Sequence, residues 1–169
     1  GSGSVHLTGD NSGYDGEFHF GPDQEVIEND SNALGNGGDI EIIGGGDGGL
    51  VIADAEKPNS SFDNNFKGDG SITLDNSDVI FTGDNSELTG DLIIEDDSHL
   101  HTIDHGVPGG DIYNHGGWTA EVNPEIDVDF NGELSGEGDL HKIGDGNLNL
   151  NGGNSHFGGN TIVDEGALN

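Results

Sequence analysis

The sequence contains no cysteine, no methionine and no arginine, and its only permanently basic side chains are Lys57, Lys67 and Lys142. Without cysteine, no disulfide bond can stabilise the fold. Against the three lysines stand 34 aspartate and glutamate residues, so the formal net charge is -31. Because nucleic acids and anionic membrane surfaces bind clustered cations, we expect neither as a partner. No apolar run approaches the length of a membrane span, and no membrane insertion is expected.

Apolar residues are also scarce, at 29% of the chain, whereas 33 residues are glycine. Low hydrophobicity with high net charge is typical of disordered chains. Here, however, the apolar residues are periodic, and a solenoid needs only a narrow core column filled by every second residue of its strands. We therefore expect one folded domain without a convincing helix.

One pattern occurs three times. Its copies are VHLTGDNSGYDGEFHF from Val5 to Phe20, VIFTGDNSELTGDLII from Val79 to Ile94, and LNLNGGNSHFGGNTIV from Leu148 to Val163. Each copy opens with two apolar residues at alternate positions, continues through glycine and an Asn-Ser pair, and closes with a second apolar stretch. Alternation predicts strands, and glycine and asparagine are typical of turns. Each copy is therefore predicted to form a strand, a corner and a second strand.

A unit this short cannot bury its apolar face alone, so it must stack on similar units. The copies begin at residues 5, 79 and 148. Each interval is too long for one coil and fits about three coils of roughly 20 to 25 residues. We predict an all-β fold over residues 5–169, a right-handed parallel β-helix of about seven or eight coils. Residues 1–4, GSGS, are interpreted as the remnant of a cloning linker, with the chain a segment of a longer protein.

The stretch FNGELSGEGDLHKIGDGNLNLNGGNSHFGGNTIVDEGAL, from Phe130 to Leu168, resembles the passenger-associated repeat of bacterial autotransporters, which are type V secretion proteins. The family pattern reads approximately F-x-G-x-L-S-G-x-G-x-L-x-K-x-G-x-G-x-L-x-L-x-G-x-N-x-x-x-G-G-x-T-x-V-x-x-G-x-L. The matching positions are Phe130, Gly132, Leu134, Ser135, Gly136, Gly138, Leu140, Lys142, Gly144, Gly146, Leu148, Leu150, Gly152, Asn154, Gly158, Gly159, Thr161, Val163, Gly166 and Leu168.

The resemblance implies a function as well as a fold. In that family the repeat lies towards the C-terminal end of the secreted passenger, near the autochaperone segment that promotes folding outside the cell. It implies a structural segment of a surface or secreted virulence factor, exported through the periplasm and outer membrane. The implied partners are the rest of the same passenger and its outer-membrane translocator. The residues expected to form the folding core are Leu134, Leu140, Ile143, Leu148, Leu150, Phe157, Ile162 and Val163.

The least regular stretch, residues 95–124, holds Tyr113, Trp118 and two prolines. We predict a long corner or projecting hairpin, and loops on rigid scaffolds are common sites of recognition. Tyr113 and Trp118 are therefore candidate contacts for a host surface or cytoskeletal protein, in adhesion, self-association or host-protein recruitment. The alternative is that both aromatic side chains only cover one side of the core column.

Two groups of histidine and carboxylate residues are candidate metal ligands. His99 and His101 share one strand face, and with His105 and His115 they form the densest histidine group. A transition metal would need a third ligand, and the alternative is a solvated polar face. The stretch IDVDFNGE opens like an EF-hand loop but lacks the closing glutamate, so it is predicted to be a strand with Asp127 and its neighbour Asp129 facing outward. We expect no dedicated metal site and no cofactor.

Enzymatic catalysis is the remaining class of function. Carboxylate pairs such as Asp96 and Asp97 suit a glycosidase, but with so many acidic residues they arise by chance. A lyase acting on acidic sugars would need cations that the chain does not have. Neither a Ser-His-Asp arrangement nor a glycine-serine elbow is found. We expect no enzymatic activity.

Overall fold

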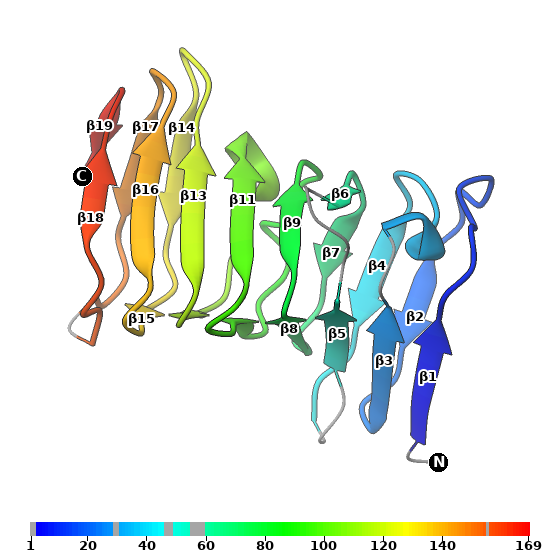
Figure 1. Ribbon diagram of the computed structural model, residues 1–169. Helices are drawn as coiled ribbons and strands as arrows, with labels where there is room; N and C mark the ends of the chain where they lie inside the picture. The colour runs from blue at the N-terminus through cyan, green and yellow to red at the C-terminus, as the bar shows by residue number, and fades with distance from the viewer. Residues whose placement is uncertain (1–2, 29–30, 46–48, 55–59, 155) are drawn as a thin grey trace.

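A computed structural model describes residues 3–28, 31–45, 49–54, 60–154 and 156–169 of the chain. In this part of the chain, parallel strands stack side by side into a solenoid, and the two termini lie at opposite ends of the stack (Figure 1). None of the helices in the described ranges is both long and apolar enough to cross a membrane.

The solenoid has three faces. The first is a seven-stranded sheet in the order β1 (Gly3–Leu7), β3 (Gln24–Glu28), β5 (Gly49–Ala53), β8 (Ser71–Asp75), β10 (Leu92–Ile94), β12 (Ile112–Asn114) and β15 (Leu134–Ser135). The second is a six-stranded sheet in the order β18 (Thr161–Val163), β16 (Asp139–Ile143), β13 (Gly117–Glu121), β11 (His99–Ile103), β9 (Asp78–Phe81) and β6 (Ser60–Phe62). The third face carries two three-stranded sheets, β2 (Phe18–Phe20), β4 (Asp39–Ile42) and β7 (Asn65–Lys67), and β14 (Asp127–Phe130), β17 (Asn147–Leu150) and β19 (Ala167–Leu168).

Two short 3-10 segments, η1 (Ser31–Leu34) and η2 (Asp104–Gly106), complete the regular structure of the described residues. Neighbouring strands of the seven-stranded sheet pair residues about 20 to 24 positions apart in the sequence, which is one coil of a β-solenoid. The predicted parallel β-helix is confirmed, with about seven turns.

The three copies of the repeated pattern each form a strand, a corner and a strand, as predicted. The first runs from β1 to β2, the second from β9 to β10, and the third from β17 to β18. They begin on three different faces of the solenoid, so the copies do not stack on one another.

Inward-facing side chains form one continuous core column. Trp118 is fully buried, and its ring lies 5.7 Å from that of Phe130 in an edge-to-face arrangement. The indole N–H of Trp118 donates to Thr102 Oγ1 at 3.0 Å, which satisfies the one polar atom of this side chain. Further towards the N-terminus, Phe62 and Phe81 pack edge to face with ring centroids 5.9 Å apart. Aromatic side chains thus supply much of the core volume that the sparse aliphatic composition leaves open.

Five of the eight residues predicted to form the folding core lie in the column or against it. Leu134, Leu140 and Leu148 are fully buried. Leu150 and Phe157 are partly buried and pack against the column. The alternation of apolar residues was a sufficient guide at these five positions.

The other three predicted core residues are not in the core. Ile143 and Ile162 face outward, and Ile162 is 45% exposed, because strand alternation directs Leu140 and Lys142 inward. Val163 pairs with Lys142 on the inner side, but its strand β18 lies at the edge of the sheet and Val163 is 44% exposed. The prediction followed the apolar character of Ile143 and Ile162. The alternation of side chains along β16 and β18 instead directs both residues outward.

Lys142 occupies a core position. Its ammonium group donates to the carbonyl oxygens of Ile143 at 2.7 Å, Gly144 at 2.6 Å and Glu165 at 3.3 Å. Burial lowers the pKa of Lys142. Three backbone acceptors at one corner are satisfied in this way, so the lysine joins two successive coils.

The projecting hairpin predicted for residues 95–124 is not formed. Strands β11, β12 and β13 lie in this range, and each pairs in register with the coils on both sides. Pro108 and Pro124 fall between strands, where they interrupt no ladder. The segment is therefore an ordinary part of the solenoid.

At the N-terminus, Gly3 and Ser4 are the first residues of β1 and pair with Gln24 and Glu25. These two residues of the predicted linker remnant thus belong to the sheet, and residues 1–2 lie outside the described ranges.

Candidate functional site on the seven-stranded sheet

The outer face of the seven-stranded sheet carries a row of uncharged side chains that runs along the solenoid axis. Strand alternation sends every second residue outward, and the parallel register places equivalent outward residues side by side. We call this row the axial stripe. It consists of Ile27, Val51, Thr73, Ile93 and Tyr113. The tyrosine is 39% exposed and the other four side chains are half-buried.

Acidic residues border the C-terminal part of the stripe on one side and its middle on the other. Asp91 and Asp111 lie two positions before Ile93 and Tyr113 of the stripe. Glu133 lies two positions before Ser135, which follows Tyr113 in the same outer row, and we call these three carboxylates the first rail. Two positions after the stripe lie Asp75 and Glu95, the second rail. Equivalent positions of the two rails on one strand, such as Asp91 and Glu95, are four residue steps apart, a distance of about 13 Å.

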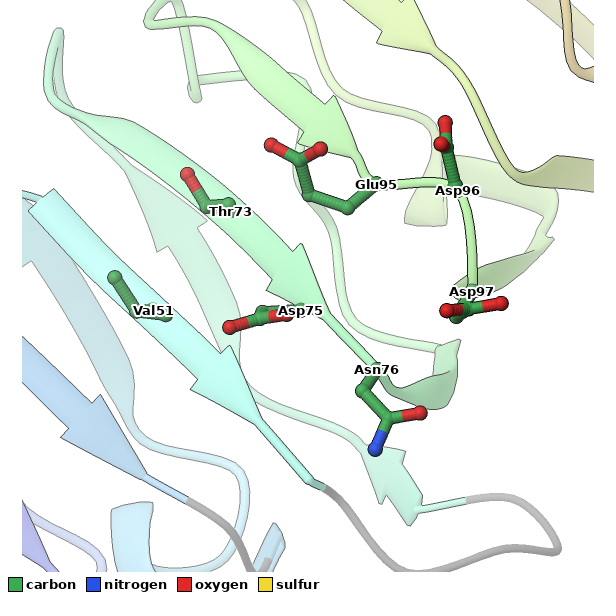
Figure 2. A pocket seen from close by; sticks show the side chains of 7 residues that line it. All are labelled: Val51, Thr73, Asp75, Asn76, Glu95, Asp96 and Asp97. Carbon is green, nitrogen blue, oxygen red and sulfur yellow. The ribbon is translucent and has the colours of Figure 1, made fainter.

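Each rail borders a shallow cavity. The cavity beside the second rail has a volume of about 350 Å³, and its lining residues are Val51, Thr73, Asp75, Asn76, Glu95, Asp96 and Asp97. Figure 2 shows Val51 and Thr73 on neighbouring strands, with Glu95, Asp96 and Asp97 following one another after β10. The cavity beside the first rail has a volume of about 310 Å³, and its lining residues are Asp111, Tyr113, Glu133, Ser135 and His156. Both cavities therefore combine stripe residues with carboxylates.

The first rail is electrostatically strained. Burial, with a further contribution from the neighbouring carboxylate of Asp111, raises the pKa of Asp91. The pKa of Tyr113 is also raised, chiefly by Asp91 and then by burial, Asp111 and Glu133. The shift of Asp91 reflects mainly the cost of burying a charge, whereas the shift of Tyr113 reflects mainly the cost of placing negative charge beside negative charge.

Within the part of the chain that the structure describes, two of the three carboxylates of the first rail have hydrogen-bond or ion-pair partners. Asp111 accepts a hydrogen bond from the backbone N–H of Glu133 at 2.8 Å, and Glu133 pairs with His156 Nδ1 at 2.8 Å. Among the described lysines, Lys67 pairs with Asp39 on the third face and Lys142 is inside the core. Within the described ranges, no lysine neutralises Asp91 or Asp111.

The structure separates the two residues predicted to contact a partner. Tyr113 faces outward on β12 and belongs to the axial stripe, so it stays a candidate contact. Trp118 faces inward on β13 and is fully buried, so its prediction as a contact was wrong. The alternative interpretation, that an aromatic side chain covers the core, holds for Trp118.

The predicted histidine group is dispersed. His99 and His101 do share the outer face of β11, but His99 Nε2 lies 2.9 Å from Thr119 Oγ1 and His101 Nε2 lies 3.0 Å from Glu121 Oε2. His105 lies in η2, and His115 follows β12. Burial lowers the pKa of His99. In the part of the chain that the structure describes, no three or more His, Cys, Asp or Glu residues gather as metal ligands.

The EF-hand-like stretch is a strand, as predicted. Asp127 and Asp129 face outward on β14, and they accept hydrogen bonds from the side-chain amides of Asn147 and Asn149 on β17. The bond to Asp129 Oδ1 measures 2.8 Å. These carboxylates join successive coils.

The rails are the part of the site that sequence reasoning missed. The signal was present, because Asp91, Asp111 and Glu133 each precede an inward-facing leucine or isoleucine of the same core row. It could be recognised only once the register of β10, β12 and β15 was known. In a chain with 34 acidic residues, sequence proximity alone does not single out these three.

Comparison of the chain with protein-family models, with curated proteins and with solved structures found no match. The fold and the outer face define the class, a parallel β-solenoid with an acidic, partly apolar sheet face.

Proposed function

We propose that this chain is a structural β-helical segment of a bacterial autotransporter passenger, and that its C-terminal coils nucleate folding. The proposal extends the resemblance of residues 130–168 to the passenger-associated repeat. In this role the segment supports secretion and display of a surface virulence factor. Its partners are the rest of the passenger and the outer-membrane translocator, and it performs no catalysis.

One observation carries the proposal. The coil with β12, β13 and β14 and the coil with β15, β16 and β17 pair strand to strand on all three faces. In the middle of the chain, β4, β5 and β6 pair with β7, β8 and β9 on all three faces as well. The first two coils, for comparison, pair on two faces, through β1 with β3 and β2 with β4. More ladder bonds per coil favour either fully paired set of coils over the first two coils as a folding nucleus. The resemblance of residues 130–168 to the passenger-associated repeat favours the C-terminal set.

Propagation then follows from the geometry of stacking. Once β13 and β12 are in place, their free edges present backbone donors and acceptors to β11 and β10 of the preceding coil. Adding a coil to an existing edge costs less than forming the first pair, because nearest-neighbour contacts reward it at once. The buried Lys142, which fills the lysine position of the family pattern, also joins two coils of this C-terminal region.

A matched pair of core truncations tests the folding order. Leu50 and Leu134 are fully buried in the same inward row of the seven-stranded sheet, where Leu134 is the last residue at the C-terminal end and Leu50 lies four coils before it. Each change to alanine is expected to destabilise the protein by about 2–5 kcal/mol. Stopped-flow refolding and unfolding rates, measured in urea, then locate each residue relative to the transition state.

We expect Leu134→Ala to slow refolding and Leu50→Ala to accelerate unfolding with little change in the refolding rate. The opposite assignment, or equal slowing of refolding by both variants, would contradict nucleation at the C-terminal coils.

The secretion role has its own measurement. When the segment is joined to an autotransporter translocator, Leu134→Ala should reduce surface display more than Leu50→Ala. Equal display of the two variants would argue against a folding role in export, whatever the refolding rates.

A binding role through a projecting hairpin is not retained, because residues 95–124 form regular coils. Recognition through a flat sheet face would not require such a hairpin.

A further inference from the structure

The axial stripe differs from the outer rows of the other faces. Its five residues are contiguous and uncharged. On the six-stranded sheet the corresponding outer row is interrupted by histidine, in the order Ile80, His101, Thr119, His141 and Ile162. On the β14-β17-β19 sheet the outward residues are aspartate and asparagine. The stripe is therefore a continuous row without charged or histidine side chains, unlike the outer rows of these two sheets.

The dimensions of this face suit an α-helix. Adjacent strands lie about 4.8 Å apart, so the stripe from Ile27 to Tyr113 is about 19 Å long. A helix of about 13 residues has this length, and its diameter with side chains is about 10–12 Å. Such a helix, laid along the solenoid axis, fits between rails that are about 13 Å apart.

The charge of the face specifies the helix further. Carboxylates border the stripe on both sides, at Asp91 and Asp111 on one side and at Asp75 and Glu95 on the other. Lysine and arginine side chains on the two flanks of a helix could extend sideways to these carboxylates while its apolar side covers the stripe. Tyr113 would serve as the anchor, because it offers both apolar area and a ring face to a cation.

We propose that the outer face of the seven-stranded sheet binds a basic amphipathic helix of a partner protein, seated on the axial stripe between the two acidic rails. The proposal does not rest on the folding role of the C-terminal coils. It takes up Tyr113 as a contact and replaces the projecting hairpin with a flat, preformed surface.

The test uses the full chain and a synthetic helical peptide of about 16 residues, with leucine on one side, lysine on both flanks of that side and glutamine elsewhere. A second peptide of the same composition has its leucines distributed around the helix. Binding is measured by fluorescence anisotropy at low and at physiological ionic strength. Because the chain carries a net charge of -31, the second peptide reports the attraction that any cation would experience.

Three paired variants of the protein separate the contributions. Ile93→Thr/Tyr113→Thr removes apolar area and keeps residues that favour strands. Asp91→Asn/Asp111→Asn removes two charges of the first rail and keeps the side-chain oxygen that accepts the Glu133 N–H bond. The control Glu125→Gln/Asp145→Asn removes two exposed charges from the turns that flank β14 and β17.

We expect the amphipathic peptide to bind at least about tenfold more tightly than the redistributed peptide. The stripe variant should weaken its binding about tenfold at both ionic strengths, and the rail variant should weaken it mainly at low ionic strength. The control variant should change binding by less than about twofold. Equal binding of the two peptides would overturn the proposal, as would an equal loss in the rail and control variants, because either result means general attraction of cations.

Discussion

At the scale of single residues, the solenoid assigns polar side chains to opposite tasks. Lys142 is buried and satisfies three carbonyl groups, whereas Asp91 is held beside Asp111 without a cation of the described chain to balance them. The lysine stabilises a corner between coils. The crowded aspartate lowers stability, which is a common property of surfaces that are arranged for binding.

The cost of this crowding depends on pH. Because the pKa of Asp91 is raised in the folded state, the folded protein binds this proton more tightly than the unfolded chain does. The associated stability is fully present below the ordinary pKa of 3.8 and is lost as pH rises through the higher folded-state pKa. Asparagine carries no charge at any pH and avoids this loss.

We therefore expect Asp91→Asn to increase the free energy of unfolding at pH 7 and to give no increase below pH 3.8. Urea denaturation across this range measures the difference between variant and wild type. Asp23→Asn, which removes one exposed charge in the turn before β3, is the matched control. A gain for Asp91→Asn that persists in acid, or that only equals the gain of the control, would show that Asp91 is not specifically strained.

At the scale of elements, the corners determine how closely successive coils can stack. Gly132 lies directly over Gly110 of the preceding coil, and a Cβ atom at Gly132 would collide with the carbonyl oxygen of Gly110. Gly153 lies at the equivalent corner one coil further on, and a Cβ atom added there would meet only open space. Glycine is thus required at some corner positions by close backbone approach, and at others no neighbour requires it.

This distinction predicts opposite effects for the same substitution. Gly132→Ala should destabilise the protein by about 1–3 kcal/mol, because the coils must separate to admit the methyl group. Gly153→Ala should leave stability unchanged or raise it by up to about 1 kcal/mol through the unfolded chain. Thermal unfolding followed by circular dichroism measures both, and equal effects of the two changes would refute the stacking argument.

The elements also show what could be predicted from sequence. Alternation and glycine spacing predicted the strands and their parallel stacking, because both signals are local and repeat with every coil. The sequence offered the burial of Trp118 only as one of two alternatives, because Pro108 and Pro124 around it suggested an interruption and instead fall between strands. Lys142 points inward and Ile143 points outward because side chains alternate along β16. Apolar character alone predicted the wrong direction for Ile143.

At the scale of the whole molecule, nearly all stabilising contacts join one coil to the next. The axial stripe and its rails exist only because about five coils stack in register, so no single segment of the sequence contains the site. This is why Tyr113 could be selected from the sequence and Asp91, Asp111 and Glu133 could not. The same dependence on neighbouring coils makes the order of coil formation the central question about this protein.

Pulse-labelling hydrogen exchange during refolding answers that question most directly, because it reports when each backbone amide enters a ladder. We predict that amides of β13, β14, β16 and β17 become protected first, followed by β11 and then by strands progressively closer to β1. Protection that begins in β1 and β3, or that develops simultaneously in all coils, would contradict nucleation by the C-terminal coils.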